Sequence, residues 1–251
     1  MNVILAIILL LLMIYVCGSH GIKLFLSIIY NLIITLIAFY IMVFGINAIA
    51  ISLLACFIIS RIVLFHVNGD NIKTRSSMKS IIVVLVLLVL SIFIMTNLSR
   101  IAGFGYESFE EINMFSYDIG IDFTNISTAL ILIGLIGATI DSSIAISSAL
   151  YEVKENNKNL SSKELFQSGI NIGKDILGTT MNTLLFAFLG EFMTLLIYFK
   201  TGNYTFGEII NSKTFAAEFI KIVFSAIGCI MVIPITSYIT SKELEKIRKR
   251  E

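Results

Sequence analysis

Residues 24–65 read LFLSIIYNLIITLIAFYIMVFGINAIAISLLACFIISRIVLF, an apolar run in which Arg61 is the single charged residue. As one α-helix this run would extend about 63 Å, roughly twice the ~30 Å hydrocarbon core of a bilayer. It is therefore too long to cross a membrane once. Gly45-Ile46-Asn47, near its middle, has the residue types of a turn. We predict two membrane-spanning helices here, over residues 24–44 and 45–65.

The rest of the chain repeats this pattern of long apolar blocks between short polar stretches. Of its 251 residues, 57% are hydrophobic and 14% charged, and the mean hydropathy is +0.94. A soluble domain cannot bury so much apolar surface. We predict an all-α polytopic membrane bundle of about seven transmembrane helices, forming one membrane domain over residues 1–251. The other five expected helices cover residues 2–17, 80–98, 128–150, 180–199 and 214–240.

The first apolar block is short enough that a signal peptide is an alternative. No basic residue precedes it, and nothing after Val16 resembles a small-residue cleavage site. We therefore expect a retained helix over residues 2–17.

The basic residues test this topology, because short cytoplasmic loops collect lysine and arginine. With seven crossings, 14 of the 18 basic residues fall on one side. They are Lys23, Arg61, Lys73, Arg75, Lys79, Lys154, Lys158, Lys163, Lys174, Lys242, Lys246, Arg248, Lys249 and Arg250. We expect the N-terminus outside and the C-terminus in the cytoplasm.

Two polar segments have structural signals of their own. Ser161-Ser162-Lys163-Glu164 fits a capping box preceded by Leu160, which predicts a cytoplasmic amphipathic helix over about residues 162–178. The outer segment from Ser99 to Ser127 interleaves acidic and aromatic residues. It is typical of an interfacial helix, and a vestibule that attracts cations is the alternative.

Asp141 is the candidate functional residue, because it interrupts the apolar block 128–150 about ten residues before its inner end. At 1.5 Å per residue the carboxylate lies ~15 Å deep, close to mid-bilayer. An acid there costs several kcal/mol unless it is protonated, paired or hydrated, so it indicates an ion or proton site. Ser148 lies on the same helical face at i+7, and the neighbouring Ser142, Ser143 and Ser147 widen the polar surface. The alternative is a protonated aspartate that only hydrogen-bonds to a neighbouring helix.

The next membrane helix has a polar face formed by Thr179, Asn182 and Thr183. Because consecutive helices are antiparallel neighbours, this face is expected to meet that of Asp141 and Ser148. The two faces would either line a water-accessible path or hold the helices together by hydrogen bonds. Glu191 lies at a similar expected depth, ~18 Å from the inner end, and could share a proton or cation with Asp141.

Other functional classes have little support in the sequence. Cys17, Cys56 and Cys229 all lie in apolar blocks without metal-ligand spacing, so no metal and no cofactor are expected. His20 and His66 are the only histidines and lie far apart, which argues against hydrolytic chemistry, and we expect no enzyme. No basic stripe exceeds what membrane topology explains, so no nucleic-acid partner is expected.

The segments IGATIDSSIAISSAL (136–150) and ELFQSGINIGKDILGTTMNTL (164–184) resemble the YibE/F family of bacterial multi-pass membrane proteins, and Gly120-Ile121-Asp122 also fits. The resemblance implies a bacterial cytoplasmic membrane protein but supplies no substrate. Glu191 is outside the resembling pattern. Besides the lipid bilayer, the expected partners are a longer member of the same family or a second copy of the chain.

A more distant similarity concerns Gly137-Ala138-Thr139-Ile140-Asp141, which resembles the aspartate helix of RND permeases and SecD/SecF. It implies that the last helices are arranged like half of an RND permease and that Asp141 couples protons. The large extracytoplasmic domain of those families is missing. We therefore expect a proton-coupled transporter or export-system accessory, with a non-transporting membrane scaffold as the alternative.

Overall fold

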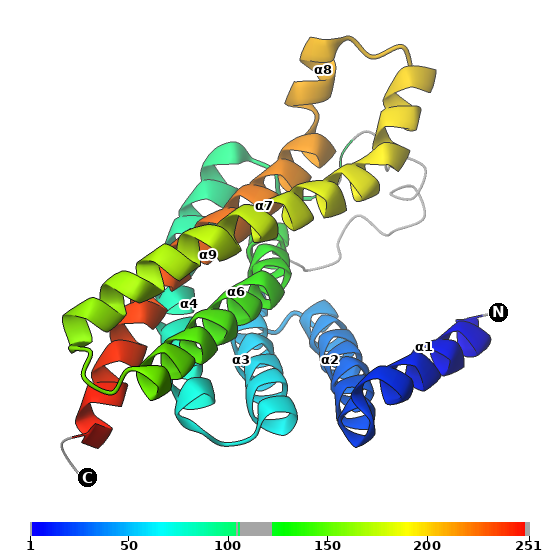
Figure 1. Cartoon of the computed structure of the whole chain (residues 1–251). Helices are drawn as coiled ribbons and strands as arrows, with labels where there is room; N and C mark the ends of the chain where they lie inside the picture. Colours follow the sequence, from blue (N-terminus) through cyan, green and yellow to red (C-terminus); the bar gives the residue numbers. More distant parts are fainter. Residues whose placement is uncertain (1, 104, 106–121, 249–251) are drawn as a thin grey trace.

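The computed structural model describes residues 2–103, 105 and 122–248 (Figure 1), and the regular structure within these ranges is helical throughout. This confirms the all-α class. In chain order the elements are α1 (Asn2–Cys17), α2 (Ser19–Val43), α3 (Ala48–Arg61), its π-helical continuation η1 (Ile62–Val67), α4 (Ile72–Ser99), α6 (Phe123–Asn156), α7 (Ser162–Thr201), α8 (Phe206–Asn211) and α9 (Lys213–Arg248). Most of the outer segment expected to be interfacial, between Ser99 and Ser127, lies outside the described residues.

Six helices in the described ranges are long and apolar enough to cross a bilayer: α2, α3 with η1, α4, α6, α7 and α9. They confirm a polytopic helical bundle. The remaining predicted span, α1, has 16 residues and a length of about 24 Å, which is shorter than the ~30 Å hydrocarbon core. It meets α2 at Gly18 in a V (Figure 1). A seventh crossing by α1 stays a prediction.

The predicted turn inside the run 24–65 is present between α2 and α3. Gly45 has a φ of +77°, a left-handed conformation that glycine adopts at little cost. The side chain of Asn47 caps α3 by accepting hydrogen bonds from the backbone N–H groups of Ile49 and Ala50, at 3.1 and 3.2 Å. The turn therefore depends on the residue types that indicated it in the sequence.

Several helices extend beyond the predicted apolar blocks. α4 begins at Ile72 rather than at residue 80, and α6 covers Phe123–Asn156 rather than residues 128–150. The amphipathic helix expected over 162–178 and the span expected over 180–199 form one 40-residue helix, α7. An apolar block marks only the part of a helix that lies in lipid. The helix itself continues until a capping residue satisfies its terminal backbone groups. The predicted capping box is confirmed, since Ser161 and Glu164 bond reciprocally at the start of α7.

α6 is the central helix of the bundle and packs against α3, α4 and α9. Its buried side chains, such as Leu132, Leu135 and Ile146, are fully enclosed by these neighbours. α7 lies against α9 on one side of the bundle, and α2 and α1 lie on the opposite side (Figure 1). Most side chains of α2 and α7 are exposed in the isolated chain, as expected for helices in contact with lipid.

The basic residues gather at one end of the bundle. The starts of α2, α4 and α7 and the ends of η1, α6 and α9 meet there (Figure 1), and these are the segments predicted to face the cytoplasm. In the η1–α4 connection, Arg75 donates two hydrogen bonds to Asp70, at 2.6 and 2.7 Å, and holds the pKa of that carboxyl below its usual range. Lys79 of α4 pairs with Glu243 of α9 at the same end.

Candidate functional site

Asp141 lies midway along α6 on a stripe of small residues that the other helices leave exposed. Gly134, Gly137, Asp141 and Ala145 follow one another at three- and four-residue spacing and are all exposed. Within the described ranges the Asp141 carboxylate makes no hydrogen bond and no ion pair; Cys229 of α9 lies within electrostatic range of it. A carboxylate on a membrane-spanning helix is thus left without a partner that would offset its charge.

The predicted polar face of α7 lies at the same depth as Asp141. Gly169 of α7 packs beside Leu150 of α6, whereas Glu191 further along α7 is level with Gly134. Because the helices are antiparallel, Asp141 is level with residues 178–184 of α7.

The side chains of that face point away from any partner helix. Thr179, Asn182 and Thr183 are exposed, and Ser148 of α6 is half-buried. Thr179 and Thr183 donate to carbonyls of their own helix, at 2.9 and 3.0 Å. The structure thus brings the two polar faces to one level without hydrogen bonds between them in the described ranges.

Glu191 belongs to an ion cluster with α9 rather than to the surroundings of Asp141. Lys221 Nζ lies 2.7 Å from Glu218 Oε2 and 3.4 Å from Glu191 Oε2. Lys221 packs against Gly134, which is seven residues, or about 10 Å, from Asp141 along α6. Sharing of a proton between Asp141 and Glu191, expected from their depths, stays a prediction. The spacing of Glu218 and Lys221 at i, i+3 was the sequence signal for the cluster.

This cluster lines a cavity of about 140 Å³ between α6, α7 and α9, toward the end of the bundle opposite the basic residues. Leu184, Phe188 and Ile222 form its apolar wall, and Ser225 adds a hydroxyl. Two carboxyl groups thus share one ammonium group at the wall of this cavity.

Replacing Lys221 by methionine should destabilise the protein, because two carboxylates within the span would lose their common counter-ion. We expect the melting temperature of the purified protein to fall by about 2–4 °C, which corresponds to ~1 kcal/mol at this size. Lys221→Arg should melt close to wild type, and Lys200→Met, at the exposed end of α7, provides the control. An unchanged melting temperature in Lys221→Met would show that the ion pairs contribute nothing.

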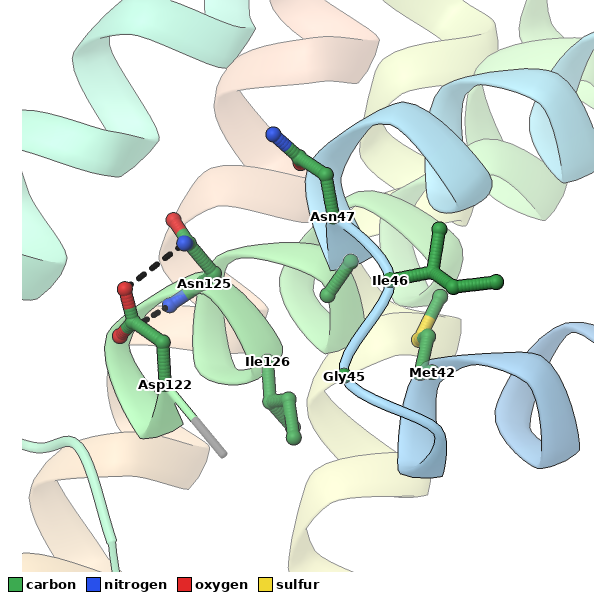
Figure 2. A pocket seen from close by; sticks show the side chains of 8 residues that line it. Met42, Gly45, Ile46, Asn47, Asp122, Asn125 and Ile126 are labelled. Atoms are coloured by element: carbon green, nitrogen blue, oxygen red, sulfur yellow. Dashed lines mark hydrogen bonds between the residues drawn. The ribbon is translucent and has the colours of Figure 1, made fainter. Parts of the chain in front are cut away.

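A second, smaller cavity of about 50 Å³ lies where the α2–α3 turn meets the start of α6 (Figure 2). Asp122 caps α6 by accepting from the backbone N–H of Thr124 at 2.9 Å. The Asn125 side-chain amide donates to the other carboxylate oxygen of Asp122 at 2.7 Å (Figure 2). Asn47 and Ile46 form the opposite wall. Asp122, which the family resemblance singled out, therefore stabilises the beginning of the helix that carries Asp141.

Sequence reasoning noted the serines beside Asp141 but did not foresee that buried hydroxyls of α4, α6 and α9 converge. Each is at most 1% exposed, although all lie in membrane-spanning helices. We call these residues the hydroxyl seam: Ser77 of α4; Ser142, Ser143 and Ser147 of α6; and Thr236 and Thr240 of α9. The signal in the sequence was the serine and threonine spacing in three separate blocks, which only the fold shows to converge.

No group of three or more histidine, cysteine or acidic side chains within the described ranges is arranged to hold a metal ion.

The described part of the chain has six helices that are long and apolar enough to cross a bilayer, and its basic residues gather at one end of the bundle. This fold defines a multi-pass membrane protein of the helical-bundle class. The sequence matches the family model described as YibE/F-like protein over residues 5–246, so the chain belongs to the YibE/F family. No curated protein and no solved structure matches it. The arrangement of the last helices as half of an RND permease accordingly stays a prediction.

Proposed function

We propose that this YibE/F protein is a proton-coupled transporter, or the membrane accessory of an export system, in which Asp141 takes up and releases protons. The observation that carries the proposal is Asp141 itself: a carboxylate midway along a spanning helix without a hydrogen-bond or ion-pair partner in the described ranges. Such a group has no counter-ion of its own and is available to bind a proton or a cation, whereas a permanently paired carboxylate is not.

The surroundings of Asp141 support exchange of protons. The glycines and alanine on its stripe leave space beside the carboxylate, and Thr179, Asn182 and Thr183 supply polar side chains at the same depth on α7. The proposal assigns these residues and Ser148 to the lining of the pathway. It assigns no bond-making chemistry, metal or cofactor to the protein.

Placement in the bacterial cytoplasmic membrane, with the C-terminus inside and the N-terminus outside, is part of the proposal. It is supported by the clustering of basic residues at one end of the bundle, as the positive-inside rule requires. Alkaline phosphatase and fluorescent-protein fusions after residues 68, 157 and 248 would test it: all three positions should report the cytoplasm.

The proposed activity is tested by proton flux in proteoliposomes. Wild-type protein should collapse an imposed pH gradient, followed with an entrapped pH-sensitive dye, faster than protein-free liposomes do. A potassium gradient with valinomycin should accelerate the collapse, because proton movement carries charge. Equal decay with and without protein would leave the chain without intrinsic proton transport.

A membrane scaffold is the second candidate function, and the exposure of the Asp141 stripe favours it. Gly134, Gly137 and Ala145 are small, and small residues allow helices to approach closely in membranes. A helix from a longer family member or a second copy, docked on this stripe, would cover Asp141 and hydrogen-bond to it. The scaffold predicts a stable complex in which replacing Gly137 by leucine dissociates the partner, and no proton flux.

A further inference from the structure

The two halves of the three-helix core formed by α4, α6 and α9 differ in how their buried hydroxyls are bonded. Toward the basic end it contains the hydroxyl seam. Toward the opposite end the same helices contribute Leu88, Leu135 and Phe224, which are at most 8% exposed. Thr96, Thr128 and Ser225 are also buried in that half, but each donates to a carbonyl of its own helix. The hydroxyls of the seam differ because they bond from one helix to another, which packing alone does not require.

The seam is continuous across the three helices. Ser77 Oγ lies 2.8 Å from Ser147 Oγ, and Ser143 Oγ lies 3.0 Å from Thr236 Oγ1. Ser143 Oγ is also 3.4 Å from the Ser77 carbonyl oxygen, so one pair leads to the next. Hydroxyls act as donor and acceptor together, which suits them to a chain of hydrogen bonds that includes water.

Two members of the seam are left without a partner. The hydroxyl oxygens of Ser142 and Thr240 are buried and make no hydrogen bond to a protein nitrogen or oxygen, and the Cys229 thiol lies beside Ser142. A buried polar atom without a partner costs free energy, and in proteins ordered water usually satisfies it. Ser142 lies between Asp141 and Ser143 around α6, because successive helical residues are 100° apart. One unpartnered hydroxyl is therefore next to the carboxylate of the proposed function.

The other unpartnered hydroxyl lies toward the basic end. Thr240 follows Thr236 by one turn on α9 and precedes Glu243 by three residues. Glu243 accepts a hydrogen bond from Ser76 at 2.5 Å and pairs with Lys79, whose side chain is exposed. Polar groups thus extend from the exposed end of the bundle to the level of Asp141.

We propose that the hydroxyl seam is a water-accessible path that opens at Glu243 and reaches Ser143 and Ser142 beside Asp141. The buried side chains of Leu88, Leu135 and Phe224 close it toward the other end. This path extends the proposed function. Its access to water is independent of that function, and only its role in supplying protons to Asp141 rests on it. It would deliver protons to Asp141 from the side of the basic end alone.

Silver ion, a small thiol-reactive cation, tests water access without any transport assay. One variant carries Ser143→Cys with Cys17, Cys56 and Cys229 replaced by alanine. The comparison variant keeps Cys56 and replaces Cys17 and Cys229; Cys56 is fully buried in the apolar core and contacts the Leu132 carbonyl. After exposure of oriented vesicles to silver, unreacted thiols are labelled with a maleimide in denaturant and counted by mass spectrometry.

We expect the Ser143→Cys thiol to react at least about tenfold faster than Cys56, and only when silver is added from the basic-end side. A smaller ratio, or reaction from the opposite side, would overturn the path. Adding Thr240→Val should slow the Ser143→Cys reaction about fivefold, since a methyl group of similar size replaces the hydroxyl and cannot hydrogen-bond to water in the path. Ser225→Ala, in the other half of α9, is the matched control and should leave the rate unchanged.

The result is separable from that of the proposed function. A reactive Ser143→Cys thiol in a protein without proton flux would leave the path standing and overturn the transport proposal. An unreactive thiol in a protein whose flux depends on Asp141 would overturn the path and leave the relay in place.

Discussion

Replacing Asp141 by asparagine is expected to lower proton flux in proteoliposomes at least about tenfold while the amount of folded protein stays unchanged. The amide keeps the shape of the side chain and its capacity for hydrogen bonds but cannot bind and release a proton. Since the carboxylate makes no hydrogen bond or ion pair in the described ranges, its loss breaks no contact of the monomer there. Size-exclusion chromatography and the melting temperature check folding beside the flux measurement.

Two further variants sharpen this prediction. Asp141→Glu keeps an ionisable group on the same stripe and should retain measurable flux. Glu191→Gln removes an acid of the span that the structure pairs with Lys221, and should leave flux close to wild type. Full flux in Asp141→Asn would contradict the relay. Loss of folded protein in that variant would favour the scaffold, in which Asp141 binds another helix.

Substitution of Gly173 by leucine is expected to separate α7 from α9. A Cβ atom placed on Gly173 would lie 2.3 Å from Ile233 Cγ2, far inside van der Waals contact. Ile233 is β-branched and has little freedom to turn away. Overpacking of this kind costs about 1–3 kcal/mol, so we expect a clearly lower melting temperature and a smaller yield of monodisperse protein.

Gly178 provides the matched control for this prediction, since it lies in the same helix, five residues further on. A Cβ atom there meets nothing within 4 Å, so Gly178→Leu should melt close to wild type. Equal destabilisation by both substitutions would mean that leucine disturbs α7 itself rather than its contact with α9. A melting temperature unaffected by Gly173→Leu would contradict the described packing of the two helices.

Much of the fold could be predicted from the sequence, because the signals are local. The apolar run 24–65 and its turn at Gly45–Asn47 follow from bilayer thickness and turn chemistry, and the capping box at Ser161 marks the start of α7. The continuity of α7 could not be predicted from hydropathy. A change from polar to apolar residues looks like a boundary, although the backbone hydrogen bonds of a helix continue across it.

The candidate site was less predictable, because its properties depend on which helices meet. The depth of Asp141 follows from its position within one helix. The pairing of Glu191 with Lys221 does not, since it depends on how α7 and α9 cross. The hydroxyl seam likewise needs three helices at once: Ser77, Ser143 and Thr236 are far apart in the chain and adjacent only in the bundle. The spacing of polar residues in the sequence identifies the polar face of a helix, but not the helix that packs against this face.

Infrared difference spectroscopy of the reconstituted protein tests most directly whether Asp141 exchanges protons. The account predicts a carboxylic-acid C=O band that appears on acidification, is absent from Asp141→Asn and persists in Glu191→Gln. Identical difference spectra for wild type and Asp141→Asn would contradict it, because the carboxyl of Asp141 would then not change its protonation state.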